Sequence, residues 1–243
     1  REAVRFGSTG KAVWRVPPPP FPVRLSVRRD GEVFAIAAGQ GLVRLFDAAT
    51  GRDMGGQRVR HAADHLALLA VELADAAPPK RGAKSAGPPV RPTLTAVVAE
   101  RGDVTLLDHL GQPHWTVSLG ATSGAPDAAH DRVVVPSFDG VHSFLLDGTP
   151  AGLYDVGAPA VRAQLDDTAA RILVLDAKSR LFLLAAQTGE TLWHLALPDD
   201  VSDVSFAPDG GAIAIALRSG AVEWLQVIDG NAATGVGSSG GFS

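Results

Sequence analysis

The side chains of this chain best suited to chemistry are seven histidines and several closely spaced aspartates. His61 and His65 stand four residues apart, a spacing that would bring both imidazoles to one metal ion on a helix. The surrounding pattern favours a strand and a turn, where the two rings would not converge. The sequence therefore predicts no metal site at this pair.

Two pairs of adjacent carboxylates, Asp166–Asp167 and Asp199–Asp200, could in principle divide the roles of acid and base. Neighbouring residues of a turn point in different directions, and aspartate is common in turns because its carboxylate bonds to nearby backbone. We interpret both pairs as turn residues. A calcium-binding loop would need alternating oxygen ligands followed by a spaced glutamate, and the sequence contains none.

Phosphate-binding and nucleophile motifs are also missing from the sequence. Gly39-Gln40-Gly41 precedes a strand pattern and not the helix whose N-terminus would hold a phosphate. There is no Gly-x-Ser-x-Gly motif, and the absence of cysteine excludes thiolate nucleophiles, disulfides and cysteine-ligated zinc. We predict no catalytic residue, no metal, no cofactor and no enzymatic activity.

A basic insertion at residues 78–92 is the most distinctive local feature. Its cations are Lys80, Arg81, Lys84 and Arg91. They could form a flexible arm that contacts an acidic partner, RNA or phospholipid. They could equally be a solvated loop, since loops tolerate such insertions at small cost, and this interpretation is favoured.

The overall composition bounds the class of protein. The 243 residues are 46% hydrophobic and 20% charged, which is typical of a globular protein with a real core. A net charge of −4 provides no global attraction to nucleic acid, so no nucleic-acid partner is expected. No apolar stretch approaches the roughly 20 residues of a membrane-spanning helix.

The compartment stays open, with the cytoplasm slightly favoured over the periplasm. Because the sequence starts at Arg1, we expect it to be a fragment whose parent chain continues upstream. The frequent alanine, glycine and proline suggest a bacterial source.

An internal repeat organises almost the whole chain. Glycines recur in similar turns at positions 10, 51, 111, 148 and 189, with intervals of 41, 60, 37 and 41 residues. The long interval contains the basic insertion, and the others match the length of one four-stranded propeller blade. Trp14, Trp115 and Trp193 each follow one of these glycines by four residues, so we predict that they are framework packing residues.

Two known repeat types are similar to these segments. Val201–Gly211, continued by Ile213–Ala216 and Gly220–Trp224, resembles a WD-repeat blade. Thr188–Trp193 and Thr9–Trp14 are similar to the repeat of pyrroloquinoline-quinone-like propellers. The Trp-Asp and Gly-His pairs of the stricter WD pattern are missing, so the repeats are a loose hybrid of the two.

The predicted fold is all-β: a propeller of four-stranded antiparallel blades at residues 1–230, with a flexible Gly/Ser-rich tail at 231–243. We expect about six blades with both end blades incomplete, which is consistent with a fragment of a larger propeller. Residues 62–77 have the composition of a helix, but the period places the first strand of a blade there, and we follow the period.

The predicted function is a non-enzymatic protein–protein interaction scaffold that acts as a subunit of a larger assembly. The alternative is a quinoprotein-like or ligand-sensing propeller with a small molecule in its central funnel. The quinone enzymes that the repeats resemble carry a calcium-binding cluster and often a vicinal disulfide, and neither is matched here. A propeller hosts many functions, so the fold by itself selects neither.

Overall fold

The computed structural model describes most of the chain as strands and turns. The described residues are 2–17, 22–38, 41–59, 63–70, 93–99, 101–108, 112–197, 201–207, 210–228 and 231–233. They include no helix, and therefore none long and apolar enough to cross a membrane. The predicted basic loop with Lys80, Arg81, Lys84 and Arg91 lies outside the described residues.

The described residues form twenty-two strands in one two-stranded and five four-stranded antiparallel sheets, which we number as blades 1 to 6. Blade 1 contains β1 (Ala3–Phe6) and β2 (Ala12–Val16). Blade 2 contains β3 (Pro22–Val27), β4 (Val33–Ala38), β5 (Leu42–Asp47) and β6 (Asp53–Arg58). Blade 3 contains β7 (Ala63–Ala70), β8 (Thr93–Ala99), β9 (Asp103–Leu107) and β10 (Pro113–Ser118).

The remaining blades follow the same strand order. Blade 4 contains β11 (Asp127–Ala129), β12 (Arg132–Ser137), β13 (Gly140–Leu145) and β14 (Pro150–Tyr154). Blade 5 contains β15 (Ala160–Leu165), β16 (Arg171–Asp176), β17 (Arg180–Ala185) and β18 (Thr191–Ala196). Blade 6 contains β19 (Val201–Phe206), β20 (Ala212–Leu217), β21 (Val222–Ile228) and β22 (Asn231–Ala233).

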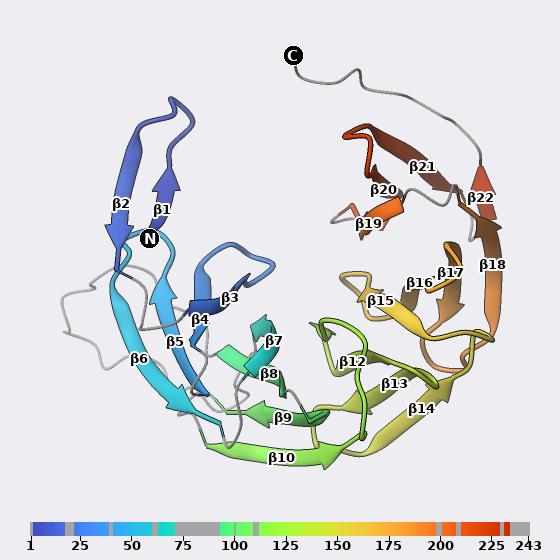
Figure 1. Ribbon diagram of the computed structural model, residues 1–243, viewed down its shortest axis with the longest axis horizontal. Coiled ribbons are helices and arrows are strands. Elements are labelled where there is room, and N and C mark those ends of the chain that lie inside the picture. The colour runs from blue at the N-terminus through green and yellow to red at the C-terminus, as the bar shows by residue number, and fades with distance from the viewer. Residues whose placement is uncertain are drawn as a thin grey trace, which may run out of the picture.

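The blades form an open arc around a central axis (Figure 1). The first strand of each complete blade lies nearest the axis, and the fourth strand lies on the outside. The inner strands contact one another in sequence, β3 with β7, β7 with β11, β11 with β15, and β15 with β19. Blades 1 and 6 stand at the two ends of the arc.

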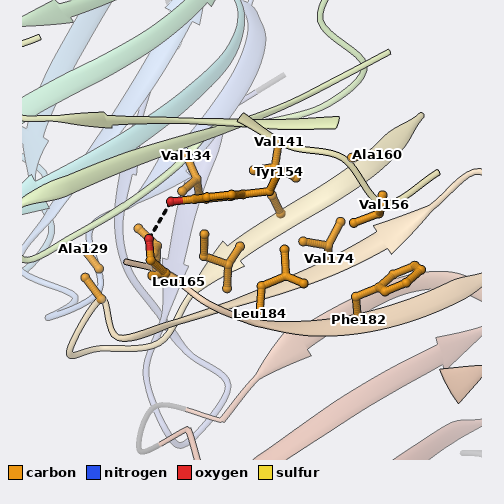
Figure 2. Packing of buried hydrophobic residues seen from close by; sticks show 14 residues of the cluster. Ala129, Val134, Val141, Tyr154, Val156, Ala160, Leu165, Val174, Phe182 and Leu184 are labelled. Atoms are coloured by element: carbon orange, nitrogen blue, oxygen red, sulfur yellow. Dashed lines mark hydrogen bonds between the residues drawn. The ribbon is translucent and has the colours of Figure 1, made fainter. Parts of the chain in front are cut away.

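The core is a series of clusters between neighbouring blades. Along β16, Ile172 and Val174 face blade 4, while Leu173 and Leu175 face blade 6. Figure 2 shows the cluster between blades 4 and 5. Because strand side chains alternate between the two faces, apolar residues at consecutive positions of a central strand serve two neighbours at once.

The structure confirms the predicted propeller and corrects its C-terminal end. The segment predicted as a strand against its helical composition contains β7 (Ala63–Ala70), and blade 1, with two strands, agrees with the predicted incomplete end blade. Blade 6 is complete, however, because β22 pairs with β21 inside the predicted tail. Asn231–Ala233 is only three residues long and has no alternation of apolar and polar side chains. No sequence pattern therefore marks this strand, and the backbone pairing with β21 identifies it.

A recurring contact joins the fourth strand of one blade to the next blade, and we call it the aromatic latch. Trp14 Nε1 donates to Ala48 O at 3.0 Å, and Trp115 Nε1 donates to Leu146 O at 3.0 Å. Both carbonyls lie in the turn between the third and fourth strands of the following blade. The predicted framework role of these two tryptophans is confirmed, since a buried indole needs a partner for its N–H.

Blade 4 makes the same latch with a different side chain. Gly152 occupies the repeat position of the tryptophan, and a Cβ added at Gly152 would lie only 2.5 Å from the ring of Tyr154. The hydroxyl of Tyr154 donates to Ala186 O at 2.6 Å (Figure 2). Trp193 packs against the core of blade 6, but its buried Nε1 has no hydrogen-bond partner among the described residues.

Each latch ring lies directly on the turn glycine of the next blade, which explains the repeated glycine. A Cβ on Gly189 would lie 2.3 Å from the Tyr154 ring, and one on Gly148 would lie 2.8 Å from Trp115. These glycines also have positive φ, which residues with a Cβ adopt at a cost.

We expect Gly189→Ala to destabilise the protein far more than Gly10→Ala. The two glycines occupy the same repeat position with φ of +73° and +74°, but no described atom lies within 4 Å of a Cβ on Gly10. Both variants bear a backbone cost of about 1 kcal/mol. Gly189→Ala must also displace Tyr154, so its thermal midpoint should fall roughly 5–10 °C further. Equal midpoints would contradict the latch.

Candidate functional site at the central channel

The innermost strands line a central channel with two adjoining hollows. One hollow measures about 310 Å³ and is bordered by residues of β3, β7 and β15 together with Pro126 and Asp127. The other measures about 270 Å³ and is bordered by Phe206, Ser205 and the turn after β15. Arg29, Asp127 and Gln164 border both hollows.

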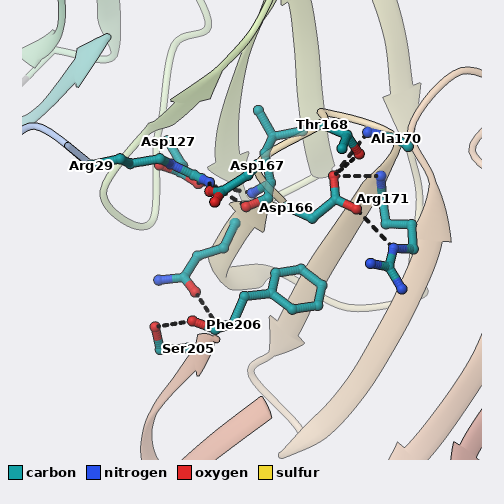
Figure 3. A network of polar contacts seen from close by, with 11 residues as sticks. Arg29, Asp127, Asp166, Asp167, Thr168, Ala170, Arg171, Ser205 and Phe206 are labelled. Atoms are coloured by element: carbon teal, nitrogen blue, oxygen red, sulfur yellow. Dashed lines mark hydrogen bonds and ion pairs between the residues drawn. The ribbon is translucent and has the colours of Figure 1, made fainter. Parts of the chain in front are cut away.

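Arg29 connects blades that are not neighbours. Its Nη2 lies 2.5 Å from Asp127 Oδ2 in blade 4, and its Nη1 lies 2.7 Å from Asp167 Oδ1 in blade 5 (Figure 3). Nη2 also donates to Leu165 O at 2.7 Å. This side chain, which follows β3 of blade 2, therefore passes blade 3 and ties three blades together at one end of the channel.

The charges at this position stabilise one another. Burial by itself would lower the pKa of Arg29, but the nearby Asp127 and the hydrogen bonds with Asp167 and Asp127 outweigh it, so the pKa is raised. Asp127 Oδ2 additionally receives the Leu165 N–H at 2.8 Å. The network is thus a set of ion pairs and hydrogen bonds that borders the channel.

The carboxylate of the neighbouring Asp166 points away from that of Asp167 and binds groups of its own blade. Its carboxylate accepts from Arg171 Nε at 2.8 Å, Ala170 N at 2.9 Å and Thr168 Oγ1 at 3.0 Å (Figure 3). Burial raises the pKa of Asp166, but the hydrogen bonds from Arg171, Thr168 and Ala170 together lower it below its usual value. Arg171 Nη2 then reaches Gly210 O of blade 6 at 3.2 Å.

Exposed apolar side chains lie beside the charged cluster. Leu25 and Val27 of β3 line the larger hollow and are 58% and 54% exposed. Leu25 and Val27 are two residues apart and therefore lie on one face of β3, and both line the larger hollow together with Arg29. An apolar surface next to fixed charges is suited to recognising another molecule.

The residues of the channel do not fit a divalent metal or a quinone held by one. Such a site needs several carboxylates that share a cation. Asp127 and Asp167 instead share a guanidinium, and among the described residues no group of three or more potential ligands converges.

The predicted site residues are distributed as follows. The interpretation of Asp166 and Asp167 as turn residues that point in different directions is confirmed. Asp203, near the other acidic pair, lies 3.3 Å from Arg162 Nε, whereas Asp199 and Asp200 lie outside the described residues. His61 and the basic loop lie outside them as well, so those predictions stay as they were.

Sequence reasoning missed Arg29. A signal was present: Arg28-Arg29 stands in the turn after the innermost strand, at the end of the channel, where the resembling segment of blade 6 has Ala207-Pro208. Arg28 is buried and donates to Thr93 Oγ1 of blade 3 at 2.7 Å.

Comparison with known families agrees with this architecture. The family model PQQ_2, described as outer membrane protein assembly factor BamB, matches residues 39–239. The chain belongs to this family. The PQQ_2 match agrees with the resemblance of the Thr-Gly-x-x-x-Trp segments to quinoprotein-type repeats, and no sequence among curated proteins matches the chain.

Solved structures share the propeller fold of this PQQ_2 member. The β-propeller domain of Cps50 (Swd1) from Myceliophteria thermophila superposes with a TM-score of 0.68 at 12% identity, covering 94% of this chain and 69% of that one. BBS1N, solved in complex with ARL6DN, superposes with a TM-score of 0.69 at 12% identity, covering 90% and 70%. At this identity the likeness concerns the fold alone.

We expect Asp166→Asn to lower stability at neutral pH and to flatten its acid dependence. The folded pKa of Asp166 lies below the unfolded value, so its stabilisation is present above the unfolded pKa of about 3.9 and is lost as pH falls through the folded value. At pH 7 the loss should be roughly 2 kcal/mol, or about 5 °C in midpoint.

The measurement is the thermal midpoint from pH 7 to pH 2.5, with the surface variant Asp131→Asn as control. The gap between the parent chain and Asp166→Asn should narrow toward pH 2.5. A gap that stays constant across this range would show that Asp166 contributes through shape and not through its charge.

Proposed function

We propose that this chain is a non-enzymatic interaction scaffold, a subunit of a larger assembly that binds a partner protein at the central channel. The observation that carries the proposal is the pair of exposed side chains Leu25 and Val27 beside the Arg29 cluster. More than half of each of these apolar side chains is exposed, so packing between the blades covers only a part of it.

The physical arrangement suits a protein partner. Interfaces combine apolar anchors, which provide most of the affinity, with a charged rim that sets orientation and register. Arg29 is already held by Asp127 and Asp167, so its charge is fixed before a partner arrives. Binding to a preorganised surface loses less conformational freedom than binding to mobile side chains.

The comparisons support a role in assemblies. The family is described as an assembly factor, and BBS1N was solved with a bound protein. We extend that mode of action to this chain as part of the proposal. Contact between the basic loop, with Lys80, Arg81, Lys84 and Arg91, and an acidic partner remains the alternative to the favoured prediction of a solvated loop.

The quinoprotein-like alternative is compatible with the family match, since both share the repeat type. The channel residues do not favour it, because the carboxylates that could hold a metal-bound quinone are paired with Arg29. A bound quinone would absorb in the near ultraviolet and visible range.

The test is affinity purification of the chain from its own cells with and without Leu25→Asp. A stoichiometric companion should elute with the parent chain, and the variant should retain at least tenfold less of it, as expected for an interface anchor. The control is Leu153→Asp, which changes a 51% exposed residue on the outer strand β14.

Two results would overturn the proposal: a parent chain that elutes alone, or a companion retained equally by Leu25→Asp. A visible absorbance band in the lone protein would favour the ligand-binding alternative.

A further inference from the structure

Among the described residues, the junction between blades 2 and 3 has no aromatic latch. In the strand register Gly55 pairs with Leu45, as Trp115 pairs with Leu106 and Trp193 with Leu183. Gly55 therefore stands at the latch position of blade 2. Among the described residues no atom lies within 4 Å of a Cβ added at Gly55, whereas at the equivalent Gly152 the Tyr154 ring fills the space.

The side chains of blade 3 that face blade 2 are also smaller than their equivalents in other blades. Thr105 is paired with Thr116, where the same positions of blade 4 hold His142 with Leu153. In blade 5 they hold Phe182 with His194. Small hydroxyl side chains thus replace long or aromatic ones in blade 3.

These substitutions leave an open groove of about 270 Å³. Blade 2 contributes Arg58 and Val59, and blade 3 contributes Val97, Ala99, Asp103, Thr105, Leu107, Pro113 and Thr116. Leu107 corresponds to Phe144 of blade 4, the residue on which Trp115 packs with 5.4 Å between ring centroids. A cavity of roughly 150 Å³ holds one benzene, so this groove has room for one aromatic side chain.

A buried hydroxyl on the same face has no partner. Thr95 lies directly opposite Leu107 in the register and is fully buried, and its Oγ1 forms no hydrogen bond among the described residues. A buried polar atom without a partner is costly and rare. Thr95 is not one of the residues that line the groove, so this hydroxyl does not by itself define the occupant.

We infer that the groove between blades 2 and 3 receives a tryptophan or tyrosine side chain from a partner protein. The chain itself defines this chemistry, because at three other junctions an indole or a phenol occupies the equivalent place and donates a hydrogen bond there. The chain's own insertion, residues 71–92, contains no aromatic residue that could do so.

This site is separate from the channel proposed above. The groove is lined by residues in or next to β6, β8, β9 and β10, whereas the channel is lined by the innermost strands. Leu25→Asp should leave the groove intact, so failure of one proposal does not decide the other.

The test uses thiol exchange at a single introduced cysteine, since the chain has none of its own. Thr116→Cys is incubated under reducing equilibrium with equal amounts of two small disulfides, one carrying an indole and the other an isobutyl group. We expect the indole adduct to exceed the aliphatic one by about fivefold, detected by mass spectrometry of the intact protein.

The matched control is Leu153→Cys, at the same repeat position of blade 4, where Trp115 already fills the junction. There the two adducts should form equally. Adding Thr105→Arg to Thr116→Cys should abolish the indole preference, and circular dichroism verifies that each variant is folded.

Equal adducts at Thr116→Cys, or the same indole preference at Leu153→Cys, would overturn the inference. Sedimentation of the chain alone tests a different occupant, a second copy. A dimer that disappears with Thr105→Arg would assign the groove to self-association and overturn the partner assignment.

Discussion

The structure depends on one constraint: a four-stranded sheet with two apolar faces must have a neighbour on each side. Blade 5 shows this most clearly, because Leu173 and Leu183 pack on blade 6 while Ile172 and Leu184 pack on blade 4. Burying each such side chain contributes about 1.5–3 kcal/mol, and no single blade could cover both faces. Where the arc ends, the opposite face of blade 6 leaves Trp224 44% exposed.

Polar contacts between the blades determine the geometry in which these apolar faces stack. Besides the aromatic latches, an arginine reaches from one blade to the next at several junctions: Arg28 to Thr93, Arg132 to Ala186 O and Arg171 to Gly210 O. Each is a buried or half-buried donor whose partner has a defined position, so it specifies how the sheets meet. Arg29 extends the same device across the channel, and the proposed partner surface is therefore built from the contacts that set the curvature of the arc.

The blades can be predicted from local sequence because the local geometry of each blade requires the turn glycine and the latch tryptophan. The glycine must accept positive φ and a ring against its Cα, so it recurs with the blade. The substitution of Tyr154 for a tryptophan was not predictable, since it depends on the space left by Gly152. The Arg29 cluster could not be predicted either, because Arg29 and Asp167 are 138 residues apart in the sequence and are brought together only by the curvature of the whole arc. The open groove likewise follows from comparing junctions in three dimensions.

The most direct test of this account is native-state hydrogen exchange followed by mass spectrometry. If latches hold the blades together, amides of β9, at the junction without a latch, should exchange faster than those of β17, where Tyr154 holds the junction. Both strands lie third in their blades and bear four or more hydrophobic or β-branched residues, so their pairing alone predicts similar protection. Faster exchange in β9 would support the latch as the stabilising element. Equal exchange, or slower exchange in β9, would contradict it.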